Sequence, residues 1–198
     1  IVYRAMLFSS HTVKGALNGV NVTEIKGARK FNLGDISVES EEMVHTMYDL
    51  AYKFVIDGKT IVITGDSSYN ERIIGFAKNA DMVVFDGSFI IYALKPPENS
   101  AFDLDTFLKV KVDGKTYKPS GPYAGNFAAE SHFKYEDIIK VSSQINSKKL
   151  ILTHLYDGRG GKPDPQTDEL KNKVVSDLKN AGFTGEVFFA VDGMEVGI

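Results

Sequence analysis

Two short apolar runs, each leading to one polar residue, constrain the fold of this chain most strongly. Residues 60–64 read Thr-Ile-Val-Ile-Thr and lead through Gly65 to the carboxylate of Asp66. Residues 149–153 read Lys-Leu-Ile-Leu-Thr and lead directly to the imidazole of His154. Short runs rich in β-branched residues are typical of buried strands. Two strands of this design, one ending in Asp and one in His, indicate a metal site.

The composition limits what such a site can contain. The chain has 198 residues, which suits one domain with a sizeable core. Its formal net charge of -3 argues against a nucleic-acid-binding surface over the whole molecule, although it leaves a local basic cleft open. There is no cysteine, so any transition-metal site must use His, Asp or Glu. No apolar run of about 18 residues occurs, so we expect no membrane-spanning helix.

The chain begins Ile-Val-Tyr-Arg without Met, and no signal peptide is visible. We expect native residues ahead of Ile1. A cytoplasmic protein is favoured, and export is left open because a leader would lie in that missing part.

The first part of the chain predicts an antiparallel meander after a helix over residues 1–17. Strands are expected at residues 20–25, 29–33, 36–40, 50–56 and 60–64. Asp57-Gly58, between the last two, is a strong two-residue hairpin signal. From residue 70 the pattern changes. Helices are expected over residues 70–80, 135–145 and 168–181, with strands over 82–85, 150–153 and 186–190.

The remaining segments are expected to be connections. Residues 87–130 hold four prolines, and we interpret them as an insertion with a short hairpin around Asp113-Gly114. A polar loop is expected over residues 156–167, and a last hairpin pairs residues 186–190 with 194–198 over Asp192-Gly193. A meander followed by alternating strands and helices predicts an α/β fold, with helices covering a sheet as one half of a layered sandwich.

Four histidines and one aspartate are the candidate site residues. On position alone His154 is as often a structural strand-end residue as a functional one, and Asp66 alone would be a helix cap. His45 and His132 lie just ahead of a strand and a helix, where a histidine is more often structural or exposed. His11 lies in the predicted first helix and is expected to be structural or exposed. Three histidines and Asp66, all at element boundaries, fit a site built from nitrogen and oxygen ligands better than chance would.

A set of short motifs follows in a fixed order along the chain. The motifs are His45 ahead of Leu50-Ala-Tyr-Lys-Phe54, Asp57-Gly58-Lys59, Gly65-Asp66, Ala77-Lys-Asn-Ala-Asp81, Phe85-Asp86, His132-Phe133, Leu152-Thr-His154 and Asp192-Gly193-Met194-Glu195. In this order they resemble the C-terminal two-thirds of the metallo-β-lactamase superfamily. The resemblance is closest to the branch that holds ribonuclease Z and the arylsulfatase-like hydrolases.

The resemblance implies an αββα sandwich, of which residues 1–198 form a single, N-terminally incomplete metallo-hydrolase domain. In that family pattern His45 is a ligand of the first metal, Asp66 bridges both metals and His154 is a ligand of the second. His132 is a non-ligand histidine near the scissile group. The metals are two zinc ions, although manganese or iron would suit the same ligands.

One family motif does not occur in this chain. The signature His-x-His-x-Asp-His supplies most of the other ligands, and we expect it upstream of Ile1, in an additional αβ half that covers the second sheet. Without that half a large apolar sheet face would be exposed. An enzymatic function is therefore expected on condition that these ligands are supplied.

The resemblance implies a metal-dependent hydrolase in which a dizinc-activated hydroxide attacks an ester, phosphodiester, sulfate ester or lactam. Asp66 would orient the hydroxide, and His132 would protonate the leaving group. Aromatic residues of the insertion would form a pocket wall or, equally, an oligomer contact. They are Phe89, Tyr92, Phe102, Phe107, Tyr117, Tyr123 and Phe127.

Two other functions are left open. One is a tRNA 3′-processing endoribonuclease, which ranks lower because the chain is slightly acidic and has no Gly- and Lys-rich arm. The other is a non-catalytic binding or assembly module, which the missing signature would explain. We expect a small-molecule substrate rather than RNA and no membrane partner, and a homo-oligomer is left open.

Overall fold

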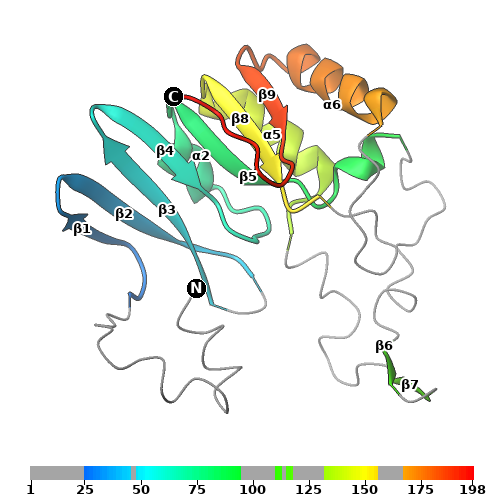
Figure 1. Ribbon diagram of the computed structural model, residues 1–198, viewed down its shortest axis with the longest axis horizontal. Coiled ribbons are helices and arrows are strands. Elements are labelled where there is room, and N and C mark those ends of the chain that lie inside the picture. The colour runs from blue at the N-terminus through cyan, green and yellow to red at the C-terminus, as the bar shows by residue number, and fades with distance from the viewer. Residues whose placement is uncertain (1–24, 46–47, 95–109, 113–114, 118–131, 156–166) are drawn as a thin grey trace.

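The computed structural model describes residues 25–45, 48–94, 110–112, 115–117, 132–155 and 167–198, which contain a seven-stranded sheet and a separate two-stranded one (Figure 1). The larger sheet carries the fold. The strand order is β1-β2-β3-β4-β5-β8-β9. The strands are β1 (Arg29–Leu33), β2 (Ile36–Met43), β3 (Asp49–Ile56), β4 (Lys59–Ile63), β5 (Met82–Asp86), β8 (Lys149–Thr153) and β9 (Glu186–Phe189). The helices are α2 (Arg72–Ala77), η1 (Ile90–Ala93), α5 (Tyr135–Ile145) and α6 (Asp168–Asn180).

The first four strands form an antiparallel meander, as the sequence predicts. Asp57 and Gly58 join β3 to β4 with φ of 49° and 75°, the left-handed conformation that a tight two-residue hairpin requires. From β4 onward the strands run parallel, β4 beside β5, β5 beside β8 and β8 beside β9. Parallel neighbours need crossover connections, and the helices of this half provide them.

Helices α2, α5 and α6 lie on one face of the sheet, which is the far face in Figure 1. The strands contribute alternate residues to this face, and each helix contributes a stripe spaced by three or four. The resulting core includes Val62, Val83, Phe85, Leu150 and Leu152 from strands with Ile73, Ile138 and Val174 from helices. The predicted α/β class is confirmed, and so is a sheet covered by helices.

The opposite face of the sheet is also partly apolar. Tyr52 and Phe54 stack there with ring centroids 6.2 Å apart, and Ile63 is 40% exposed. Within the described part of the chain no helix covers this face. The additional N-terminal half expected to cover it stays a prediction.

The end of the chain differs from the sequence prediction. The predicted hairpin of residues 186–190 with 194–198 is wrong, because β9 pairs in parallel with β8 and residues 190–198 form no strand. The chain does turn at Asp192 and Gly193, with Met194 N–H donating to the carbonyl of Val191. It then runs back toward β8, where Lys149 Nζ donates to the carbonyl of Gly197 at 2.7 Å.

Other boundaries shift by a few residues. β2 continues to Met43, whereas helix α2 covers only part of the predicted 70–80 segment. The insertion contains the expected hairpin, β6 (Val110–Val112) with β7 (Lys115–Tyr117), and also the unpredicted η1. The predicted helix 1–17, nearly all of the strand 20–25, His11 and most of the 156–167 loop lie outside the described residues. No described helix is long and apolar enough to cross a membrane.

Candidate metal centre

The candidate site residues gather at one edge of the sheet because of strand direction. β4, β5 and β8 run parallel, and β2 shares their direction because it is separated from β4 by one antiparallel strand. The carboxyl ends of all four strands therefore meet at the same edge. His45, Asp66, Asp86 and His154 lie at or just after these ends.

Asp66 and His154 form the closest predicted pair. Nδ1 of His154 lies 2.8 Å from Oδ1 of Asp66. His154 has φ of 56°, a left-handed conformation that is uncommon outside glycine. The hydrogen bond to His154 holds the pKa of Asp66 below its ordinary value, with burial opposing it. Burial alone would lower the pKa of His154. The hydrogen bond to Asp66 and the negative charge of Asp66 raise it by more, so the pKa lies above its ordinary value.

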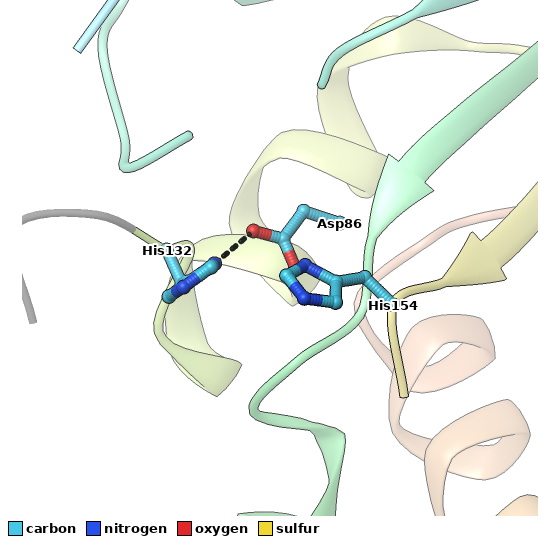
Figure 2. A group of neighbouring side chains, drawn as sticks. All are labelled: Asp86, His132 and His154. Atoms are coloured by element: carbon cyan, nitrogen blue, oxygen red, sulfur yellow. Dashed lines mark hydrogen bonds and ion pairs between the residues drawn. The ribbon is translucent and has the colours of Figure 1, made fainter. Parts of the chain in front are cut away.

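His132 is paired with a carboxylate that the sequence prediction did not include among the site residues. Its Nδ1 lies 2.7 Å from Oδ2 of Asp86, which is buried at the end of β5 (Figure 2). The other oxygen of Asp86 accepts a hydrogen bond from the backbone of Ser88 at 2.9 Å and another from its hydroxyl. A carboxylate only accepts hydrogen bonds, so Nδ1 of His132 donates and Nε2 lies on the side of the ring away from Asp86.

The imidazoles lie side by side. The ring centroid of His132 is 6.1 Å from that of His45 and 5.1 Å from that of His154, both edge to face. Phe89 contacts the same ring from another side, with centroids 5.8 Å apart. Of the seven aromatics predicted to line a pocket, Phe89 is the one whose side chain the structure describes.

The structure thus brings His45, Asp66, His132 and His154 into one cluster. Sequence reasoning missed three further members. Asp86 could have been found as another carboxylate at a strand end, whereas Ser88 and Asp49 carry no distinguishing sequence signal. Their placement depends on contacts made across the fold.

Asp49 opens β3 beside the turn that presents Asp66. A Cβ at Gly65 would lie 2.8 Å from Oδ2 of Asp49, and Gly65 has φ of 69°, so this turn requires glycine. Burial raises the pKa of Asp49 to about 7. The charges of Asp66 and Asp86 add to this rise, and a backbone hydrogen bond at Leu50 opposes it.

For the metal-free protein we expect Asp49→Asn to gain stability over the wild type as the pH rises. The unfolded carboxyl group ionises near pH 3.8 and the folded one near pH 7, so wild-type stability falls between these values while asparagine does not titrate. Above pH 7 the carboxyl group is ionised in both the folded and the unfolded protein, so the difference in unfolding free energy between Asp49→Asn and the wild type becomes constant. Denaturant unfolding across this range measures it, with the exposed turn variant Asp35→Asn as control. A pH-independent difference would contradict the shifted pKa.

The mixed sheet and its cluster of imidazoles and carboxylates define an α/β protein with a candidate metal centre. No protein-family model and no curated protein matches the sequence. Solved structures do match. YhfI from Bacillus subtilis, a metallo-β-lactamase fold protein, is 19% identical with a TM-score of 0.56 over 87% of this chain. Zn²⁺-bound PqqB from Methylobacterium extorquens is 10% identical with a TM-score of 0.60 over 98%.

A third match is Igni18, a metallo hydrolase from Ignicoccus hospitalis, at 12% identity with a TM-score of 0.55 over 98% of this chain. The chain therefore has the metallo-β-lactamase fold, as the sequence resemblance implies. It spans 54% of the length of YhfI, 62% of PqqB and 72% of Igni18.

Proposed function

We propose that this protein is a metal-dependent hydrolase whose centre is the cluster at the edge of the sheet. The observation that carries the proposal is the convergence of three imidazoles and two carboxylates at the strand ends of a metallo-β-lactamase fold. Gathering so many polar groups in a partly buried place is costly unless they are partnered, and here His132 pairs with Asp86 and His154 pairs with Asp66. The group consists of His45, Asp66, Asp86, His132 and His154.

The donor atoms of this cluster fit a divalent metal. One donor atom each from Asp86, His132 and His154 lie within 4.8 Å of one another, a spacing typical of metal ligands; of these three residues we assign His154 to the metal, and His132 and Asp86 to proton transfer and its support. Zinc binds nitrogen and oxygen ligands at about 2.0–2.2 Å, so ligands of one ion lie within such a span. Imidazoles and carboxylates suit zinc, and also iron or manganese.

The existing contacts separate ligands from supporting residues. Asp86 accepts hydrogen bonds from Ser88 on Oδ1 and from His132 on Oδ2, and Nδ1 of His154 lies 3.8 Å from Oδ1, so we assign this carboxylate the role of orienting His132. The Asp66 side chain is 53% exposed and contacts His154 through Oδ1, so its carboxylate would be accessible to a metal. We propose three ligands from this chain, namely His45, Asp66 and His154.

When bound, a pair of zinc ions supplies a Lewis acid and an acidified water as the nucleophile. Asp66 orients the nucleophile. His132 donates a proton from Nε2 to the leaving group, because Nδ1 is engaged with Asp86. Asp86 keeps the imidazole ring in the orientation that this transfer needs, and Phe89 packs edge to face against the same ring.

A complete dimetal centre needs more ligands than these three. We propose that a His-x-His-x-Asp-His segment ahead of Ile1 supplies them, so the activity belongs to the protein that carries both halves. The proposed substrate is a small ester, phosphodiester, sulfate ester or lactam. The net charge of -3 gives no support to a tRNA-binding surface.

Metal analysis and hydrolysis assays on the full-length protein test this proposal. After zinc loading and dialysis we expect about two zinc ions per chain. At least one of four chromogenic substrates is expected to be hydrolysed: nitrophenyl acetate, bis-nitrophenyl phosphate, nitrophenyl sulfate and a chromogenic cephalosporin. Chelation should abolish the activity and zinc should restore it.

Two results would contradict the proposal. Clearly less than about one zinc ion per chain after loading would favour a non-catalytic binding module. Bound zinc without hydrolysis of any small substrate, together with tight and salt-sensitive tRNA binding, would favour the endoribonuclease.

A further inference from the structure

We propose that Ser88 is a positioning residue that fixes the orientation of the Asp86–His132 pair. The inference rests on the proposed hydrolase function, in which His132 protonates the leaving group. Ser88 does not contact the leaving group in this proposal and acts through its neighbours.

Ser88 donates twice to one oxygen of the Asp86 carboxylate. Its backbone N–H lies 2.9 Å from Oδ1, and its hydroxyl donates to the same oxygen. The second oxygen, Oδ2, accepts from Nδ1 of His132 at 2.7 Å. With two donors on Oδ1, the carboxylate is held against rotation and presents one defined oxygen to the histidine.

The turn that carries Ser88 packs tightly against the end of β8. Gly87 N–H donates to the carbonyl of Thr153 at 2.8 Å. A Cβ at Gly87 would lie 2.7 Å from Cδ2 of Leu155 and 3.1 Å from the Thr153 carbonyl oxygen, so only glycine fits here without a shift. Ser88 itself is 3% exposed. A buried hydroxyl on so confined a turn is preorganised to hold the carboxylate.

This arrangement sets the tautomer of His132. While Asp86 accepts from Nδ1, the neutral ring carries its proton there, and Nε2 exchanges the second proton. The Ser88 hydroxyl oxygen is itself 3.4 Å from Nδ1. Removing the hydroxyl takes away one of the two Ser88 donors to Oδ1 of Asp86 and leaves the backbone N–H, so the carboxylate is held less firmly and the imidazole can populate both tautomers.

A nucleophilic role for Ser88 does not fit the geometry. In a Ser-His-Asp triad the serine and the carboxylate contact opposite nitrogens of the histidine. Here both Ser88 and Asp86 approach Nδ1 of His132. The hydroxyl also donates to the carboxylate and not to the imidazole, so the histidine cannot take its proton.

The first test compares hydrolysis of an alkyl ester and an alkyl phosphodiester by Ser88→Ala, Ser88→Thr and Ser142→Ala in the full-length, zinc-loaded protein. Ser142 is a matched control, since it is buried on α5 and its Oγ has no hydrogen-bond partner among the described residues. We expect Ser88→Ala to lower kcat about tenfold or more with KM and zinc content unchanged. Ser88→Thr should restore kcat, and Ser142→Ala should leave it at the wild-type value. In a His132→Gln background Ser88→Ala should cause no further loss, because the two residues act as a unit.

The second test is independent of hydrolysis. Nitrogen NMR of the histidines in metal-free protein, at alkaline pH, should show His132 as the Nδ1–H tautomer in the wild type and as a mixture in Ser88→Ala. An unchanged tautomer, or a kcat within about twofold of wild type, overturns the positioning role. Covalent labelling of Ser88 by a fluorophosphonate also overturns it. A tautomer change in a protein that hydrolyses nothing would keep the positioning role and reject the proposed function instead.

Discussion

Replacement of Asp66 by alanine is expected to weaken metal binding by more than about 100-fold and to abolish hydrolysis. Loss of an outer-shell partner typically costs about 10–100-fold in metal affinity, and loss of a bridging ligand costs more. The variant also leaves His154 without the carboxylate 2.8 Å from its Nδ1. Zinc content after dialysis and competition with a chelator measure the change.

The matched control for this variant is Asp35→Ala, which removes an exposed carboxylate in the turn between β1 and β2. Asp66 is half exposed, so alanine at this position leaves the core intact, and circular dichroism should show a wild-type fold. Equal zinc contents in the two variants would show that Asp66 is not a ligand.

Replacement of His132 by glutamine is expected to lower kcat about 10²–10⁴-fold on substrates with alkoxide leaving groups. An alkoxide is a poor leaving group unless it is protonated, and Nε2 of His132 is the proposed donor. The zinc content should stay at the wild-type value, because His132 is not one of the three proposed ligands. Steady-state kinetics on an alkyl ester and an alkyl phosphodiester measure the loss.

The leaving group supplies an internal control for His132→Gln. Nitrophenolate is a stable anion that needs no proton, so the variant should lose less activity on nitrophenyl substrates. An equal loss on both kinds of substrate would argue against proton donation. Loss of zinc would make His132 a metal ligand supported by Asp86, which is a common arrangement for ligating histidines.

Much of the fold followed from local sequence patterns. Helix α5 begins and ends as predicted, because Ile138, Val141 and Ile145 repeat with the helical period and Asn146 ends the helix in a left-handed conformation. The closing hairpin was wrong for a physical reason. Alternation and a turn signal predict an extended chain but not the strand with which it pairs. Here β9 follows α6 in the chain and pairs in parallel with β8.

The site was predicted in part. Strand ends pointed to Asp66 and His154, and the family resemblance added His45 and His132. The partner of His132 lies 46 residues away in sequence, so no local pattern links it to Asp86. The shifted pKa of Asp49 could not be predicted either, because it arises mainly from burial, which depends on the folded surroundings.

The left-handed backbone conformation of His154 lowers the stability of the folded protein, whereas its imidazole serves the proposed chemistry. A residue with a Cβ pays roughly 1–2 kcal/mol in this conformation, a cost that glycine avoids and asparagine reduces. Selection for thermal stability alone would therefore tend to replace the imidazole at position 154. The more stable protein would have lost a group that contacts Asp66, so a heat-selected library and an activity-selected library should diverge at this position.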